Sequence, residues 1–196
     1  MASIITHSLA AGLFGKSIHW HQNRRLFVLT LLCASLPDAD VFGHWFGVPY
    51  LSSWGHRGGT HSFAFAFGVG LILGPWASDS NTSWFKKILN GLYLGLITAS
   101  HPLLDMLTTG GHGVALWAPL DESRIFFDHH YRVIQVSPLR ISRFFTSRGL
   151  VVLKSELYWV ILPCLGCFSL RWSIQKGYTF LSTPQNQTSG EDPREL

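Results

Sequence analysis

The stretch His56-Arg57-Gly58-Gly59-Thr60-His61-Ser62 places two imidazoles and a guanidinium around a glycine pair, directly before a long uncharged segment. Two other polar stretches stand next to apolar segments in the same way. Pro37-Asp38-Ala39-Asp40 ends the apolar segment before the glycine pair, and Ser100-His101-Pro102-Leu103-Leu104-Asp105 lies inside the apolar segment after it. Ionisable side chains beside apolar helices cost free energy unless they are paired or bind a ligand. The three stretches therefore indicate one shared functional site, and a metal site suits their residue types best.

The composition favours a membrane protein. The chain has 196 residues, of which 47% are apolar and 13% are charged, and this charged share is about half of that in soluble domains. The length suits one domain, which we expect over residues 1–182, followed by a disordered polar tail at residues 183–196. The formal charge of +4 is spread along the chain, so nucleic acid is not an expected partner. Contact with anionic membrane lipid is expected instead.

The apolar segments predict an all-α protein, an integral membrane bundle of about five helices. The expected helices are Ile4–Gly15, Leu26–Leu36, Thr60–Trp76, Lys86–Leu107 and Leu150–Leu170. Thr60 suits the N-cap of the third helix, and Pro102 is expected to kink the fourth because proline lacks a backbone N–H. A short interfacial helix is expected around Ile141–Phe145. Because a membrane-spanning helix needs about 20 apolar residues and some segments are shorter, a soluble helical bundle stays open as an alternative.

If all the helical segments cross the membrane, the ionisable candidates fall on one side of it. Helix starts and ends then alternate between the two sides, and one side receives His7, Asp38, Asp40, His56, His61, His101, Asp105 and Glu156. A single site at one membrane face requires this agreement. Lysine and arginine in the short connections fall mostly on the other side, so the positive-inside rule predicts that the site faces away from the cytoplasm.

The spacing of these residues suits a divalent metal. His101 and Asp105 are four positions apart, which puts both side chains on one face of a helix. Asp38 and Asp40 would point the same way in an extended segment, so one could bind a metal while the other bridges or holds a histidine in its tautomer. The metal ligands that we expect are His7, Asp38, Asp40, His56, His61, His101 and Asp105. Imidazole and carboxylate together suit zinc, manganese or iron, and this set can fill one or two metal sites.

Paired metals suit hydrolysis of a phosphoester, because one ion activates water while both stabilise the charged oxygens. Arg57 would add a bidentate contact to the phosphate, and Glu156 would act as a general base. Plainer interpretations stay open: His101 and Asp105 could be a structural pair, Pro37–Asp40 a turn that ends a helix, and Glu156 a solvated surface residue. We expect no ligand role for His19, His21, His44, His129 and His130, while His112 stays an open candidate.

The motifs together resemble the YdjM-like family of bacterial inner-membrane metal-dependent hydrolases. The resemblance covers about Thr6 to Pro119 and rests on Thr6-His7, Leu36–Asp40, His56–Ser62 and Ser100–Gly110. That family is distantly similar to zinc-dependent phospholipase C and the related fungal zinc nucleases, which implies a helical core of their type. The implied metal ligands are His7, one of Asp38 and Asp40, His56 or His61, His101 and Asp105. The secreted enzymes also use their mature N-terminal amino group and a further His/His/Glu set, for which His112 and Glu156 are the candidates.

The sequence thus predicts a multi-pass protein of the bacterial inner membrane that hydrolyses a small-molecule or lipid phosphoester with one or two Zn²⁺ ions. Three alternatives stay open. The His/Asp cluster could bind or transport ions or protons without hydrolysis. The protein could also be a soluble helical enzyme, or a structural membrane subunit without an active site.

Overall fold

The computed structural model describes residues 1–17, 23–138 and 141–182 of the chain. These residues form helices, and among them β-structure is limited to isolated bridges that join Thr108 to Ile134 and Val114 to Ile125. The all-α prediction is therefore confirmed. The predicted tail at residues 183–196, as well as His19 and His21, lies outside the described residues.

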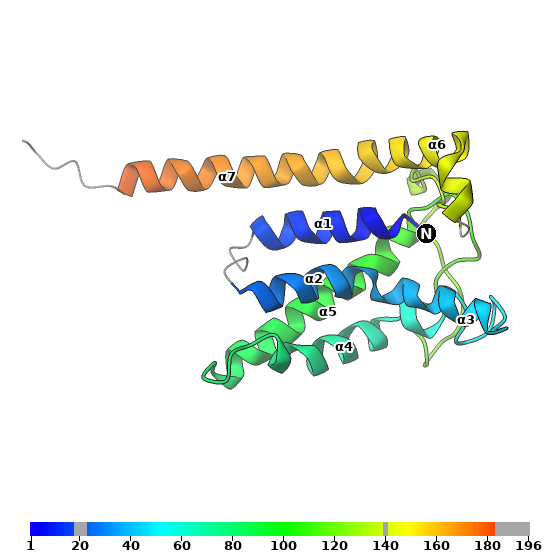
Figure 1. The fold of residues 1–196 in the computed structure, drawn as a ribbon, viewed down its shortest axis with the longest axis horizontal. Helices are drawn as coiled ribbons and strands as arrows, with labels where there is room; N and C mark the ends of the chain where they lie inside the picture. Colours follow the sequence, from blue (N-terminus) through cyan, green and yellow to red (C-terminus); the bar gives the residue numbers. More distant parts are fainter. Residues whose placement is uncertain (18–22, 139–140, 183–196) are drawn as a thin grey trace, which may run out of the picture.

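The long helices pack side by side in an order that differs from their order in the chain (Figure 1). In space the order is α4 (Phe63–Trp76), α5 (Trp84–Met106), α2 (Arg24–Ser35), α1 (Ile4–Ser17) and α7 (Leu162–Ser182). α5 is thus in contact with both α4 and α2, so its last turns are enclosed by neighbours. This enclosed end of α5 carries the ionisable motif that the sequence singled out.

The shorter elements connect the long helices. They are the 3-10 helices η2 (Leu36–Asp40), η3 (Gly59–His61), η4 (His129–Tyr131) and η5 (Ile141–Phe145), the helices α3 (Val41–Trp45) and α6 (Ser147–Glu156), and the π-helix η6 (Leu157–Ile161). α6, η6 and α7 follow one another without a break. Figure 1 shows α3, α6 and the N-terminus at the same end of the bundle.

The helices expected from the sequence agree closely with α1, α2, α4 and α5, but two details differ. The N-cap of α4 is Ser62, whose Oγ accepts a hydrogen bond from the backbone N–H of Phe65 at 3.1 Å. Thr60, the expected N-cap, lies in η3, and its hydroxyl donates to Asp40 instead. The last apolar helix extends to Ser182, well beyond the expected end at Leu170.

α4 and α5 approach each other closely through glycines. A Cβ added to Gly70 would lie 2.3 Å from the carbonyl oxygen of Gly91, and one added to Gly74 would lie 2.5 Å from the Cα of Gly91. Small residues four positions apart allow this backbone contact between helices, as in membrane bundles. This contact fixes the position of α5 relative to α4, and with it the position of the C-terminal end of α5.

Replacing Gly70 with alanine is expected to lower the thermal unfolding midpoint of the purified protein by about 5 °C, since overpacking costs about 1–3 kcal/mol. The added methyl group would meet backbone atoms of α5, which cannot rotate away. Gly68→Ala is the matched control, because a Cβ on Gly68 meets nothing within 4 Å and gains the same helix propensity. Equal midpoints for the two variants would contradict the close packing of α4 on α5.

Two helical segments are long and apolar enough to cross a membrane, Arg24–Trp45 and Ser147–Lys176, while α4 is apolar but shorter. Large apolar side chains also cover the outside of the bundle: Leu32 is 59% exposed, Ile72 74% and Leu170 65%. Such a surface suits contact with hydrocarbon better than contact with water. Crossing of the membrane by all the long helices stays a prediction.

Candidate metal centre

Carboxylates and imidazoles from three elements meet at one end of the bundle. Asp38 on η2, His61 at the end of η3, and His101 and Asp105 on α5 each offer a donor atom, and these atoms all lie within 4.8 Å of one another. No side chain of this set is more than 2% exposed. His101 and Asp105 share one face of α5 because about four residues complete a helical turn. We call these four residues the metal cluster.

The distances within the metal cluster equal those of a tetrahedral metal site or are somewhat longer. His101 Nε2 lies 3.3 Å from Asp38 Oδ1, and His61 Nε2 lies 3.8 Å from both Asp38 Oδ1 and Asp105 Oδ2. Ligand atoms around a tetrahedral zinc with bonds of about 2 Å are about 3.3 Å apart. The cluster therefore has room for one ion among its donors.

Most of the atoms that face this space have no hydrogen-bond partner in the protein. They are both carboxylate oxygens of Asp38, His61 Nε2 and His101 Nε2. Leaving a buried polar atom unpaired costs about 1–3 kcal/mol, and here several such atoms converge on one point. A divalent cation would satisfy all of them together, so the donor set fits a metal.

The second ring nitrogen of each cluster histidine is held by an acceptor. His101 Nδ1 donates to the carbonyl oxygen of Ala34 at 2.7 Å, and His61 Nδ1 faces Asp40 Oδ2 at 3.1 Å. Because these partners only accept, each ring carries its proton on Nδ1 and leaves the lone pair of Nε2 free. Burial also lowers the pKa of His61 below its ordinary value, which keeps the ring neutral and able to bind a metal.

Asp40 supports the metal cluster from outside. Its Oδ1 contacts His56 Nδ1 at 2.6 Å, and its Oδ2 accepts from the backbone N–H of Arg57 at 3.1 Å and from the Thr60 hydroxyl at 2.7 Å. With His61 as a further donor, the carboxylate of Asp40 is fully occupied. It belongs to a second group with donors close together, Asp40, His56 and His61, which shares His61 with the cluster.

The different directions of Asp38 and Asp40 follow from the local backbone. The two carboxylates would point the same way in an extended segment, but Leu36–Asp40 is a 3-10 helix. With about three residues per turn, side chains two positions apart point to different sides. Asp38 therefore faces the metal cluster while Asp40 holds a cluster histidine.

Arg57 is fully buried beside Asp105. Its Nε donates to Asp105 Oδ2, its Nη1 to the Gly110 carbonyl and its Nη2 to the Thr108 hydroxyl, each at 3.0 Å. Its backbone has φ of 67°, in the left-handed region that costs a non-glycine residue about 1–2 kcal/mol. These contacts give Arg57 a positioning role for Asp105. Its predicted contact with a phosphate stays a prediction, and one that would require the guanidinium to leave these partners.

Glu156, at the end of α6, contacts the first residues of α1 and is not one of the metal donors. Its Oε2 accepts from the hydroxyls of Ser3 at 2.7 Å and Thr6 at 2.8 Å, and its Oε1 accepts from the backbone N–H of Ser3. In a capping box the acid comes from the third residue of the same helix. In α1 that position is occupied by Thr6, which has no carboxylate. Glu156 at the end of α6 accepts the hydrogen bond from the backbone N–H of Ser3 in its place. The predicted general base is thus engaged in holding α1, and its catalytic role stays a prediction.

His7 lies beside the metal cluster on α1. Its ring stacks on His101 with centroids 3.7 Å apart, and its Nε2 lies 3.5 Å from Asp105 Oδ1. Neither ring nitrogen has a hydrogen-bond partner. His7 is therefore placed as an additional donor next to the cluster.

A pocket of about 210 Å³ reaches the edge of this site. The rings of Tyr50 and His56 are 5.3 Å apart, those of Tyr50 and His112 are 5.0 Å apart, and all three residues line the pocket. His56 connects the pocket to the cluster, since its ring lies 5.5 Å from that of His61. A small molecule in the pocket would thus be separated from the cluster by His56.

Some residues that support the site could not be identified from the sequence. Arg124 donates to the carbonyl oxygens of Tyr50, Ser52 and His56 and so holds the loop that carries the pocket. It stands 68 positions after His56, and no spacing pattern links the two. Thr108 was visible only as part of the longer motif.

Among the described histidines not expected to be ligands, His44, His129 and His130 are exposed. Asp128, His129 and His130 do have donor atoms close together. They are consecutive on a solvated turn, where both Nδ1 atoms contact Asp128 Oδ1, so an ordinary surface ion pair explains them.

Comparisons with known proteins agree with the membrane assignment. A family model described as YdjM inner membrane protein matches residues 1–178. The chain is 38% identical over 179 residues to the inner membrane protein YbcI of Escherichia coli (strain K12), which covers 88% of this chain and 98% of that protein. No solved structure matches the chain.

Proposed function

The chain belongs to the YdjM inner membrane protein family, and from this premise we propose that it is a membrane-bound, metal-dependent hydrolase of a phosphoester or lipid. The observation that carries the proposal is the metal cluster, in which buried donor atoms without partners converge from η2, η3 and α5. A protein that only needed to fold would be more stable with apolar side chains there. Retaining these groups at such a cost supports a functional role.

Zinc is the proposed metal. Asp38, His61, His101 and Asp105 form a mixed set of nitrogen and oxygen donors, which suits Zn²⁺ and, less closely, Mn²⁺ or Fe²⁺. His7 offers a further donor, and a second ion would have to use it or the group around Asp40. When bound, the ion supplies a Lewis acid that polarises a phosphoryl oxygen and makes water nucleophilic near neutral pH.

The surrounding residues support this chemistry by orientation. Asp40 keeps His61 in the tautomer that presents Nε2, and Arg57 fixes Asp105. His56 stands between the pocket and the cluster, where it would meet a substrate in the pocket. Tyr50 and His112 also line the pocket, and their rings would contact a substrate bound there.

A second function is favoured by the burial of the metal cluster. Because His61, His101 and Asp105 are 0% exposed, an ion could be held there as a structural element or be bound and released without any hydrolysis. The pocket at His56 favours the hydrolase, whereas the sealed donors favour this alternative. Turnover separates the two functions directly.

We expect the purified protein to hydrolyse bis-p-nitrophenyl phosphate or a short-chain phospholipid in detergent, and to lose this activity when a chelator removes its metal. Addition of Zn²⁺ should restore it, because the donors are held in place by protein contacts that need no metal. Metal content is measured by mass spectrometry alongside product formation. Bound metal without turnover of either substrate would refute the hydrolase and support the non-enzymatic ion-binding protein.

The proposal places the protein across the membrane more than once, with the metal cluster at the face away from the cytoplasm. It is supported by two candidate spans, Arg24–Trp45 and Ser147–Lys176, and by basic residues at the ends of helices remote from the cluster. Labelling of an introduced cysteine from outside spheroplasts would test this orientation.

A further inference from the structure

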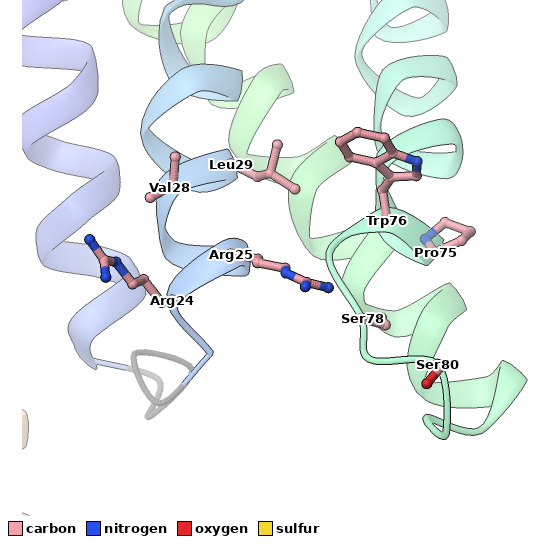
Figure 2. A pocket seen from close by; sticks show the side chains of 8 residues that line it. All are labelled: Arg24, Arg25, Val28, Leu29, Pro75, Trp76, Ser78 and Ser80. Carbon is pink, nitrogen blue, oxygen red and sulfur yellow. The ribbon is translucent and has the colours of Figure 1, made fainter.

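We propose that a groove at the opposite end of the bundle from the metal cluster binds an anionic phospholipid, with an acyl chain along its apolar wall and the phosphate beside Arg25. The groove has a volume of about 940 Å³ and lies between the start of α2 and the end of α4 (Figure 2). It shares no residue with the metal cluster or the pocket at His56. The inference is therefore independent of the proposed hydrolysis.

The wall of the groove is apolar on both sides. Val28 and Leu29 come from α2, and Pro75 and Trp76 come from α4 (Figure 2). Val28 is 46% exposed and Trp76 is 78% exposed, so much apolar area remains uncovered by the protein itself. A hydrocarbon chain along the groove would cover this area, which stabilises the complex.

Two arginines at the start of α2 have no partner among the described residues, and Figure 2 shows that of the two only Arg25 extends across the groove, while Arg24 extends toward α1. Arg24 and Arg25 begin α2 and line the groove, and no ion pair or side-chain hydrogen bond joins either one to the described part of the chain. Figure 2 shows the guanidinium of Arg25 extending toward Ser78 across the groove. Arginine binds phosphate well because its planar fork can donate two parallel hydrogen bonds.

The charge around the mouth is mainly positive. Besides Arg25, Lys87 in the first turn of α5 reaches the groove, because its Nζ donates to the carbonyl oxygen of Ser80, a lining residue, at 3.4 Å. An anionic headgroup is therefore favoured over a zwitterionic one.

The groove lies at the depth where a lipid headgroup meets hydrocarbon. The candidate span Arg24–Trp45 begins at its arginines, and the apolar helix α4 ends at Trp76. Arginine, lysine and tryptophan gather at the membrane–water interface. A lipid phosphate at the mouth and an acyl chain in the groove would thus each lie in their ordinary layer of the bilayer.

The two sides of the groove are joined by the protein itself. Asn23 Nδ2 donates to the carbonyl oxygen of Ala77 at 2.8 Å, and its Oδ1 caps α2 by accepting from the N–H of Leu26 at 3.1 Å. On the α5 side, Asn90 Nδ2 donates to Ser78 Oγ at 2.8 Å. These bonds hold the groove open in a fixed shape, which lowers the entropy cost of binding a lipid.

The test compares thermal unfolding of the purified protein in neutral detergent with added phosphatidylglycerol or phosphatidylcholine. We expect phosphatidylglycerol to raise the unfolding midpoint by roughly 5 °C and phosphatidylcholine to change it little. The double variant Arg24→Gln/Arg25→Gln should lose most of this gain. Arg171→Gln/Lys176→Gln, which removes two charges on α7, is the matched control and should keep it.

Equal gains from the two lipids, or a full gain in the Arg24→Gln/Arg25→Gln variant, would overturn the proposal. If that variant does not fold, Val28→Trp decides, because its larger side chain obstructs the apolar wall of the groove and keeps both arginines; a full gain there also overturns the proposal. A gain that disappears when the metal is removed would assign the lipid to the metal cluster instead. A change of oligomeric mass in Val28→Trp with the lipid gain intact would show that the groove contacts a second copy of the chain.

Discussion

Replacing His101 with alanine is expected to lower the metal affinity of the purified protein by more than about 100-fold, since even residues that only hold ligands in place contribute about 10- to 100-fold. His101 Nε2 lies 3.3 Å from Asp38 Oδ1 and has no hydrogen-bond partner, and its ring is oriented by Ala34. Without it the metal cluster retains three of its four donors, and a tetrahedral site needs four. The metal-to-protein ratio and a competition titration with a chelator measure the loss.

Two further variants make this result specific. Asp40→Asn should weaken metal binding by about 10- to 100-fold and still allow full occupancy at high metal, because Asp40 orients a ligand. His129→Ala should change nothing, because that side chain is 77% exposed and lies far along the chain in a surface turn. Full metal content in His101→Ala combined with loss in His129→Ala would move the metal to the exposed group around Asp128.

Replacing Arg57 with glutamine is expected to lower the free energy of unfolding of the metal-free protein by about 3 kcal/mol, because it breaks a buried ion pair and leaves Asp105 only the N-terminal amine, 4.0 Å from Oδ2, as a cation partner. The Arg57 side chain is 0% exposed, and Nε donates to Asp105 Oδ2 at 3.0 Å. The Gly110 carbonyl and the Thr108 hydroxyl would lose their donors at the same time. Thermal unfolding should show a midpoint lower by about 10 °C.

Arg57→Lys separates charge from geometry. It keeps a cation near Asp105, but the compact lysine ammonium cannot reach all three acceptors as the planar guanidinium does. The Arg57→Lys protein should therefore recover only part of the lost stability. Arg143→Gln is the control for removal of an arginine, since Arg143 is exposed and surface substitutions change stability little. An Arg57→Gln protein that unfolds at the wild-type temperature would contradict the ion pair with Asp105.

The parts of the fold that depend on neighbouring residues could be predicted from the sequence. Apolar runs ended by proline or glycine gave the long helices, and the spacing of His101 and Asp105 put both on one face of α5. The alternation of helix ends also predicted that the ionisable stretches gather at one end, and the structure brings His7, Asp38, His61, His101 and Asp105 together there.

The parts that depend on distant contacts could not be predicted in the same way. The directions of Asp38 and Asp40 were inferred only for an extended segment, whereas Leu36–Asp40 forms a 3-10 helix. The position of Arg57 depends on Thr108 and Gly110, which are 51 and 53 positions away. No local sequence pattern indicates that the guanidinium of Arg57 donates all its hydrogen bonds to residues so far along the chain.

The bond between Glu156 and the start of α1 has a consequence for biosynthesis. Ser3 and Thr6 leave the ribosome 153 and 150 residues before the carboxylate that receives their hydrogen bonds. Until then α1 has no acid at its first turn, and the helix that carries His7 is held by its packing on α2. A nascent chain can therefore insert its early helices before it can complete the place where His7 meets Asp105. In the proposed metal-dependent hydrolase, an ion would therefore be bound only after the last helix has been made.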